Sequence, residues 1–384
     1  MNSSDNGDKA RPGEPEQTNS TLSRRSVALD ALRGFDMFWL VGGTGLVAAV
    51  VDLCGPRVQA VLGPQLDHAK WEGCMFYDVI FPLFVFLVGM SVVFSLDRLK
   101  EESSARKVYA RILRRFVLMF LLGLIYYGGL RDPWPGVRLL GVLQRLALCY
   151  LFAAVLYYHF RLRTLAAVAV GILLGYWILL SFVPVPGSGA TGVNEEMNWT
   201  RYVDEQFLPG RKHEGSWDAN GLLSTAPAIG TCLLGVFAAR LLKSERHSQT
   251  RKALYFLGAG LALAALGWVW GIQFPVIKKL WTSSYVLVTG GYSLMFLGAF
   301  CLVIDVWGFR KWVQPLVWIG ANPLTIYMAR NIADFNAFAD RFVGGSIAAA
   351  VTPEAAYLFH TAVSFAFSML LVRFLYKKRI FLRV

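Results

Sequence analysis

The sequence predicts an all-α polytopic membrane protein with about ten transmembrane helices and both termini in the cytoplasm. Of the 384 residues, 55% are hydrophobic and only 16% are charged, a composition that would make a soluble domain of this length aggregate. The apolar segments are continuous over about 20 residues, which is the length of a membrane-spanning helix. A barrel strand would instead alternate in hydrophobicity over about ten residues.

Ten apolar segments define the expected spans. Their approximate bounds are 27–51, 75–96, 112–129, 139–158, 165–183, 222–242, 254–272, 285–304, 313–332 and 355–376. An even number of spans puts both termini on one side of the membrane. Most of the 38 lysines and arginines then fall in the tails and loops of that side, which the positive-inside rule assigns to the cytoplasm.

The chain is expected to hold one tail and one domain. Residues 1–25 are rich in Ser, Asn, Gly, Glu and Pro and show no apolar period, so we expect a disordered cytoplasmic tail. The first apolar segment of the chain starts too late and contains too many charges to be a signal peptide. Residues 26–384 form a single transmembrane domain. Its long outer loop, 184–220, is expected to be either a lid or substrate-binding segment, or a solvated insertion.

Several classes of function are disfavoured. The net charge of +13 comes from clusters in alternate loops, so nucleic acid is not an expected partner. The five cysteines form neither a disulfide framework nor a zinc spacing. No pair of histidines has the spacing of metal ligands, and no glycine loop would cradle a phosphate. We therefore expect no metal and no nucleotide hydrolysis.

Chemistry is expected in the stretch 66–82, which joins a histidine and several carboxylates to the start of the second span. In the predicted topology this stretch lies on the outer side of the membrane. His68 stands just before the span, and Asp78 lies at its entrance. Ionisable groups at such a position need a partner or a function, because burying charge in a bilayer is costly.

Other polar residues lie inside the predicted spans. Asp30 and Arg33 share one face of the first span and can pair, either as an anchor at the interface or as part of a site. Gln144 and Arg145 lie near the outer end of the fourth span, at a depth similar to that of Asp78, so Arg145 is expected to face the bundle interior.

Asn322 precedes a proline in the ninth span. The proline frees a backbone carbonyl, and the asparagine side chain can either satisfy it or reach a ligand. Taken residue by residue, these features fit both a transporter and an enzyme.

The residues of five motifs resemble those of the heparan-α-glucosaminide N-acetyltransferase family. The motifs are LDALRGF at 29–35, DHAKWEG at 67–73 followed by DVIFPLFVFLVG at 78–89, GVLQR at 141–145, WDANGLLST at 217–225, and GANPL at 320–324. They occur in the family's order, and the resemblance covers residues 25–375. This family contains a lysosomal transmembrane enzyme and many bacterial relatives. The short N-terminal tail resembles the bacterial members, which implies a bacterial inner (cytoplasmic) membrane.

The resemblance implies a transmembrane acyltransferase, an acetyl-CoA:amino-sugar N-acetyltransferase. Such an enzyme takes the acetyl group from cytosolic acetyl-CoA and transfers it to the amine of glucosamine or a terminal glucosaminide on the outer side. The histidine of the family's H-x-x-W-x-G motif is catalytic, which here is His68, and Trp71 is expected at the substrate. Some members have an asparagine beside that histidine, and Thr44 is its replacement in this chain.

An amine attacks a thioester only when it is unprotonated, so the site needs a base, and histidine is the side chain suited to that role near neutral pH. His68 would either take the proton of the amine or accept the acetyl group and pass it on. Asp67 and Asp78 are the candidate partners. Asp78 is favoured, because adjacent side chains usually point apart, and it would orient the imidazole or bind substrate hydroxyls.

Acetyl-CoA is expected to place its phosphates near the basic inner loops, where Arg115 is available. The pantetheine arm would pass between the helices toward His68. The candidate linings of this passage are Arg33, Gln144, Arg145 and Asn322, and Asp218 in the outer loop is expected at the acceptor.

Two other functions stay open. An O-acetyltransferase of a cell-envelope glycan would share the donor and the topology but use a hydroxyl acceptor. An amino-sugar transporter would need no CoA and should tolerate the loss of His68. The expected partners are acetyl-CoA, an amino sugar or glycan, and the lipid bilayer, and the exposed membrane faces are compatible with a homodimer.

Overall fold

The structure is a computed structural model that describes residues 27–129, 131, 133–343, 345 and 350–381. Regular structure in these residues is helical, and the β contacts among them are two isolated bridges, Glu72 with Ile277 and Lys212 with Gly215. The predicted all-α class is confirmed. The tail that we expected to be disordered, 1–25, lies outside the described residues.

The described part of the chain begins with a span made of two helices. α1 (Val27–Phe38) and α2 (Thr44–Leu53) are joined by a π-helical turn, η1 (Trp39–Gly43), in which Val41 and Gly42 leave helical geometry. Two short helices follow, α3 (Pro56–Leu62) and the 3-10 helix η2 (Gly63–Leu66). A loop then leads into the next span.

The remaining elements follow in chain order. They are α4 (Phe76–Glu102), α5 (Ala105–Tyr126), α6 (Val142–His159), α7 (Leu162–Phe182), α8 (Trp199–Phe207), α9 (Leu222–Lys243), α10 (Gln249–Trp270), α11 (Ser283–Phe300), the π-helical turn η3 (Cys301–Val306), the 3-10 helix η4 (Lys311–Val313), α12 (Gln314–Ala321), α13 (Pro323–Ile332), α14 (Phe335–Val343) and α16 (Pro353–Lys377).

Eight helical segments in the described part of the chain are long and apolar enough to cross a membrane. Two of the ten expected spans are not among them. α5 occupies the third expected span but begins with a run of basic residues. The ninth expected span is divided at Asn322, whose backbone is not helical, into α12 and α13. The protein is thus a multi-pass helical membrane protein.

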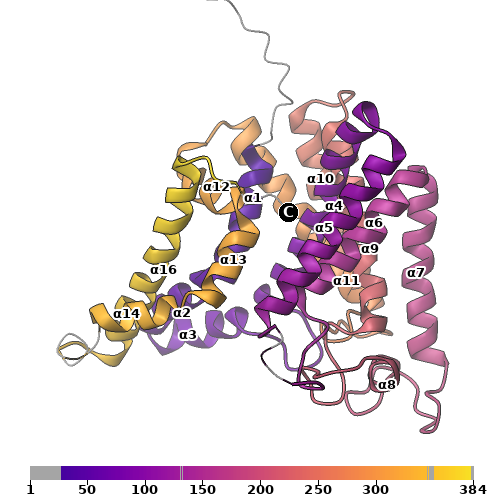
Figure 1. Ribbon diagram of the computed structural model, residues 1–384, viewed down its shortest axis with the longest axis horizontal. Coiled ribbons are helices and arrows are strands. Elements are labelled where there is room, and N and C mark those ends of the chain that lie inside the picture. The colour runs from indigo at the N-terminus through magenta and orange to yellow at the C-terminus, as the bar shows by residue number, and fades with distance from the viewer. Residues whose placement is uncertain (1–26, 130, 132, 344, 346–349, 382–384) are drawn as a thin grey trace, which may run out of the picture.

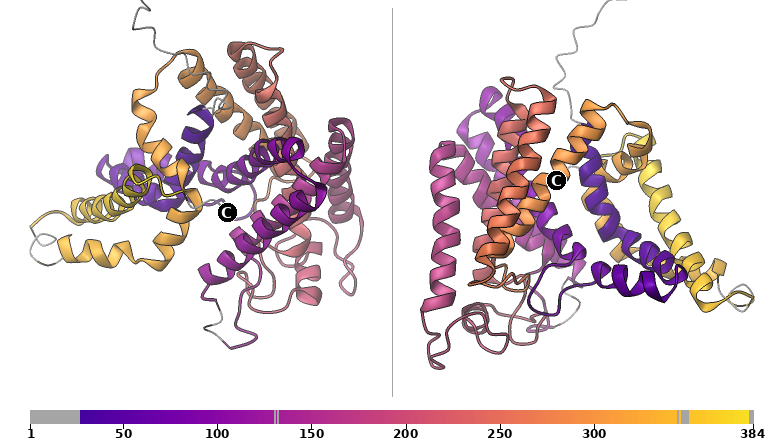
Figure 2. Two further views of the ribbon diagram at one scale, coloured as in Figure 1. Left: turned by 45° about the horizontal axis from the view of Figure 1, so that its top comes forward. Right: turned by 180° about the vertical axis from the view of Figure 1, so that it is seen from behind.

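The helices form two groups that lie side by side (Figures 1 and 2). One group holds α1, α2, α3, α12, α13, α14 and α16, and the other holds α4 to α7 and α9 to α11. α1 connects them, because it packs against α12 on one side and against α11 and α4 on the other. The segment between α7 and α9, including α8, covers the end of the second group from which α4 begins.

α4 is the central helix of the second group, and it packs against α9, α6 and α11. Two glycines allow α4 and α9 to touch. A Cβ added at Gly89 would lie 1.8 Å from the carbonyl oxygen of Cys232, and one added at Gly235 would lie 1.9 Å from that of Phe86. Small residues permit such backbone contact between membrane helices. This contact fixes the helix that carries Asp78.

The substitution Gly89→Ala should therefore force α4 and α9 apart. We expect a loss of stability of about 2 kcal/mol, the usual scale of overpacking in a tight core, measured as a lower midpoint of thermal unfolding in detergent. Gly171→Ala is the matched control, because an added Cβ there meets no atom within 4 Å and should leave the midpoint unchanged or raise it. Equal midpoints for the two variants would contradict the close helix contact.

Candidate functional site

A histidine and a carboxylate form a pair where α4 begins. Asp78 lies in the first turn of α4, and His68 lies in the loop that precedes this helix. The Nδ1 atom of His68 is 2.8 Å from Oδ1 of Asp78. The carboxylate is completely buried, whereas 49% of the histidine side chain is exposed. The structure thus brings together the two residues that the sequence favoured.

The second oxygen of Asp78 organises the loop around it. Oδ2 accepts hydrogen bonds from the backbone N–H groups of Ala69 at 3.1 Å and Met75 at 3.0 Å. The hydroxyl of Tyr285 in α11 donates to the backbone carbonyl of Asp78 at 2.7 Å. One buried carboxylate therefore holds the imidazole and the loop that carries it in a single arrangement.

The tautomer of His68 sets which of its ring nitrogens carries the lone pair. When Nδ1 donates its hydrogen to Asp78, Nε2 carries the lone pair and can take a proton or attack a carbonyl carbon. The ring is stacked on Tyr77, with 4.8 Å between the centroids and 21° between the planes. Asp67 accepts from the backbone N–H of His68 at 2.7 Å, so its observed contact is with the backbone and not with the imidazole.

Lys278 completes the cluster, and the sequence analysis missed it. Its Nζ atom lies 2.8 Å and 3.1 Å from the two ring nitrogens of His68 and 3.2 Å from Oδ1 of Asp78. Burial lowers the pKa of the Lys278 ammonium, and the neighbouring Asp78 carboxylate opposes this shift. The buried Asp78 carboxylate is therefore paired with the Lys278 ammonium as well as with the imidazole.

The loop that carries Lys278 is itself well anchored. The N–H of Gly73 donates to the carbonyl of Val276 at 2.8 Å, next to the bridge between Glu72 and Ile277. The only signal in the sequence was two consecutive lysines on the side of the membrane where the positive-inside rule predicts few.

The exposed face of His68 borders a cavity of about 280 Å³. Helices of both groups and the outer loop contribute to its wall, which includes Leu40, His68, Trp71, Tyr77, Arg138, Arg145, His213, Glu214, Asn220, Lys278, Trp281 and Tyr327. Trp71 and Arg145, both predicted from the sequence, are among them. Trp71 also donates through Nε1 to the backbone carbonyl of Val193 at 3.2 Å, which ties the outer loop to this wall.

A buried ion pair holds the outer loop over the cavity. Nε and NH2 of Arg138 each donate to a carboxylate oxygen of Asp218 at 2.8 Å. The backbone N–H groups of His213 and Asn220 donate to the same carboxylate at 3.0 Å and 2.9 Å. We expected Asp218 at the acceptor, but it is not among the described residues that line the cavity. It holds in place the segment whose His213 and Asn220 do line it.

Buried polar atoms without partners lie behind the cavity. Gln144 and Arg145 are completely buried. The side-chain amide of Gln144 and two nitrogens of Arg145 have no hydrogen-bond partner in the described part of the chain, although NH2 of Arg145 donates to Ser224. Nε of Arg115, on α5, is also unpartnered. Such groups are rare in folded proteins and call for a ligand or water.

The facing helices carry more of these atoms. Both carboxylate oxygens of Asp36, Nε1 of Trp39 in η1 and the hydroxyl of Thr325 in α13 are buried and have no partner among the described residues. Tyr327 of α13 stacks on Tyr126 of α5, with 4.6 Å between the ring centroids, so the two helix groups meet here. The unpartnered atoms thus belong to helices on both sides of the junction.

Three further residues that were predicted at the site form hydrogen bonds within the fold. Arg33 donates to Asp30 at 3.3 Å and to Ser91 at 2.7 Å. The amide of Asn322 donates to the backbone carbonyl of Ile380 at 3.1 Å, and the hydroxyl of Thr44 to that of Trp39 at 2.8 Å. The described lining of the cavity includes none of Arg33, Asn322 and Thr44.

The sequence is similar to one protein family and to two mammalian proteins. A family described as a domain of unknown function (DUF5009) matches residues 25–196. Heparan-alpha-glucosaminide N-acetyltransferase of Mus musculus is 26% identical over 377 residues, which cover 83% of this chain and 56% of the mouse protein. The protein of the same name from Homo sapiens is 27% identical over 326 residues, 69% of this chain and 48% of the human protein.

The resemblance predicted from the motifs is thus confirmed. Over most of its length the chain is a distant relative of these two acetyltransferases, and it spans about half the length of each.

Removing the guanidinium group of Arg138 should loosen the outer loop. Arg138→Met leaves the Asp218 carboxylate buried without a counter-charge, which typically costs about 3 kcal/mol or more. We expect a lower thermal midpoint and faster proteolysis within 184–220. Arg201→Met is the control, because its pair with Glu205 is partly exposed and worth less than about 1 kcal/mol. Equal protease sensitivity of the two variants would refute this role of Arg138.

Proposed function

We propose that this chain is a transmembrane acetyltransferase. It transfers an acetyl group from cytosolic acetyl-CoA to the amine of glucosamine or a terminal glucosaminide on the opposite side of the membrane, which we propose to be the bacterial inner membrane. The observation that carries the proposal is the cluster of His68, Asp78 and Lys278 at an open cavity. The names of the distant relatives support the same activity.

His68 acts as the general base in the proposed reaction. The neutral amine attacks the thioester carbonyl carbon, a C–N bond forms and the C–S bond breaks. The amine proton passes to Nε2 of His68 and from there to the departing sulfur of CoA, so the ring is regenerated. Asp78 holds the Nδ1–H and thereby keeps the lone pair on Nε2. In the alternative route Nε2 itself accepts the acetyl group before the amine does.

The donor would reach His68 between the two helix groups. The unpartnered atoms of Gln144, Arg145 and Arg115 fit a ligand that carries amides, a thioester and phosphates along its length. Arg115 lies further from the cavity and would meet the phosphates, because a guanidinium suits that contact. Arg145 lines the cavity and would lie nearest the thioester. In this proposal, acetyl-CoA supplies the hydrogen-bond partners that these polar atoms lack within the fold.

The acceptor would enter the cavity from the outer side. Trp71 offers an apolar face for a sugar ring, and the outer loop adds Glu214 and Asn220 as hydrogen-bonding groups. Asp218 acts indirectly, by holding that loop together with Arg138, which also lines the cavity. An amine acceptor distinguishes this proposal from O-acetylation of a glycan, which would need a hydroxyl at the same place.

The test is release of CoA from acetyl-CoA by purified protein in detergent, with and without glucosamine. His68→Ala should lower the glucosamine-dependent rate by about a thousandfold and Asp78→Asn by roughly a hundredfold, the range for loss of a general base or of its orientation. His247→Ala, at the opposite end of the bundle, is the matched histidine control and should keep the wild-type rate.

Each rival predicts a different outcome of this assay. Release with neutral glycans but not with glucosamine would identify an O-acetyltransferase. No release with any acceptor, together with uptake of glucosamine that survives His68→Ala, would favour a transporter. A stoichiometric burst of CoA before glucosamine is added would support the route through acetylated His68.

Lys278 should stabilise the buried carboxylate of Asp78. Lys278→Met removes the ammonium that lies 3.2 Å from Oδ1 of Asp78, and loss of one partner of a buried ion pair typically costs about 3 kcal/mol. We expect a lower midpoint of thermal unfolding in detergent, with Lys278→Arg retaining more of the wild-type value. Equal midpoints for wild type and Lys278→Met would mean that Lys278 does not compensate this carboxylate.

A further inference from the structure

A second cavity, of about 570 Å³, lies at the opposite end of α4 from the His68 cluster. It borders Asp97, which shares α4 with Asp78. At about 1.5 Å of rise per residue, the two carboxylates are roughly 28 Å apart along the helix axis. That distance is close to the thickness of the hydrocarbon core of a bilayer, so the second cavity lies at the other face of the membrane.

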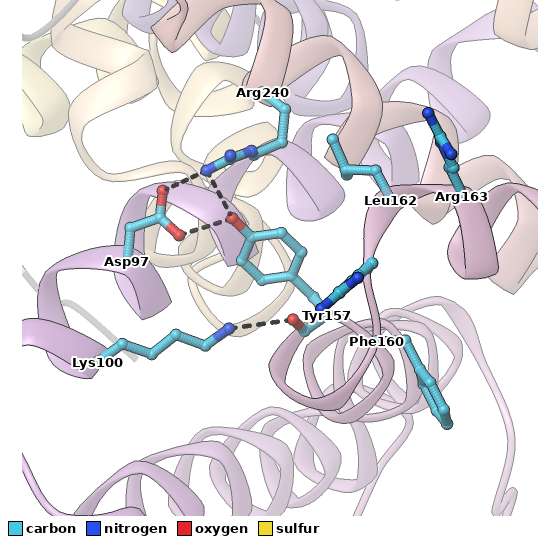
Figure 3. Close-up of a pocket in the computed structure, with 8 residues that line it drawn as sticks. Asp97, Lys100, Tyr157, Phe160, Leu162, Arg163 and Arg240 are labelled. Carbon is cyan, nitrogen blue, oxygen red and sulfur yellow. Dashed lines mark hydrogen bonds and ion pairs between the residues drawn. The ribbon is translucent and has the colours of Figure 1, made fainter.

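Half of the residues that line this cavity are basic. Lys100, Arg161, Arg163 and Arg240 line it together with Tyr157, Phe160, Leu162 and the carboxylate of Asp97. Figure 3 shows Arg240 and the hydroxyl of Tyr157 converging on Asp97. They contact this carboxylate at 3.4 Å and 2.6 Å, and Lys243 contacts it at 2.5 Å. Asp97 is thus engaged by Arg240, Lys243 and Tyr157, and Lys100 donates to the backbone carbonyl of Tyr157 at 3.1 Å. Among the cations of this wall, Arg161 and Arg163 are left without a carboxylate partner in the described part of the chain.

Arg161 and Arg163 carry that excess charge. Both are exposed, and their guanidinium groups form no hydrogen bond or ion pair within the described part of the chain. They flank the first residue of α7, whose N-cap is Arg161 and has no side-chain cap. The free N–H groups of this helix end add to the attraction for an anion at the same wall. A phosphate group fits this combination of two guanidinium groups and backbone donors.

The rim of the cavity is apolar on the side of α7. Phe160 and Leu162 are exposed there, and further along the helix Val170, Leu174 and Ile178 are exposed as well. These α7 residues lie on one face at helical spacing and point out of the bundle, because α7 packs mainly against α9. An occupant with a phosphate head and a long apolar tail would therefore contact both the basic wall and this stripe.

We propose that the cavity binds the headgroup of an anionic phospholipid, with the acyl chains lying along α7. Basic pockets between membrane helices on the cytoplasmic side bind such headgroups, and the predicted topology puts this end of the bundle in the cytoplasm. The phosphates of acetyl-CoA share part of the chemistry but have no acyl chain for the α7 stripe. The lipid site goes beyond the proposed acetyl transfer and does not depend on it.

The test uses the full chain, delipidated in detergent and titrated with dioleoyl-phosphatidylglycerol or dioleoyl-phosphatidylcholine, with bound lipid counted by native mass spectrometry. Wild type should retain one phosphatidylglycerol in preference to phosphatidylcholine. The double variant R161Q/R163Q should bind phosphatidylglycerol about thirtyfold more weakly, the scale expected for two cations beside an anionic headgroup. R246Q/R251Q removes the same charge from exposed positions at the same end of the bundle and should bind as wild type does.

Three results would overturn the proposal. They are equal retention of the two lipids by wild type, equal loss in the two double variants, and displacement of phosphatidylglycerol by adenosine 3′,5′-diphosphate that depends on Arg161 and Arg163. The last would assign the cavity to a soluble nucleotide. Thermal midpoints of all variants, measured without lipid, verify that a loss of binding is not a loss of folding. The rate of CoA release is a separate readout, so failure of the acetyltransferase proposal would leave this test intact.

Discussion

The buried carboxylate of Asp78 is the interaction on which the site depends. An ionised group without solvent is tolerated only when its oxygens are fully satisfied, and here one oxygen meets His68 and Lys278 while the other meets two backbone N–H groups of the preceding loop. Helix α4 therefore fixes the imidazole. Because α4 also packs closely against α9, the loop residue His68 is tied to a helix inside the second helix group.

The membrane imposes a second constraint, which is visible along α4. Its two ends carry the two carboxylates Asp78 and Asp97, each neutralised by basic side chains of other segments. Between these ends the helix is almost entirely apolar and buried. Polar atoms at intermediate depth occur instead on α5, α6 and the facing helices, and several lack a partner. The fold thus separates polar groups that stabilise the helix ends from polar groups that are open to a ligand.

The sequence predicted the helical membrane class and the family resemblance, because apolar length and local motifs are encoded in adjacent residues. It also favoured Asp78 over Asp67 as the partner of the imidazole. Asp67 is next to His68 in the chain, and adjacent side chains usually point apart. It did not predict Lys278, which is brought to His68 by a loop 210 positions later in the chain. The engagement of Asp218 by Arg138 was missed for the same reason. The division of the ninth span at Asn322 was suggested by its proline, but local pattern alone favoured one continuous helix.

The position of Lys278 has a consequence for the chemistry proposed at His68. A primary amine about 3 Å from the imidazole is itself an acyl acceptor whenever it loses its proton, and acetylation there would be permanent because the product is an amide. Burial favours loss of that proton, whereas the Asp78 carboxylate favours keeping it. In the proposed reaction, the carboxylate that orients the imidazole would therefore also protect the site from acetylating itself, and Lys278 would be the place to look for inactivation by the donor.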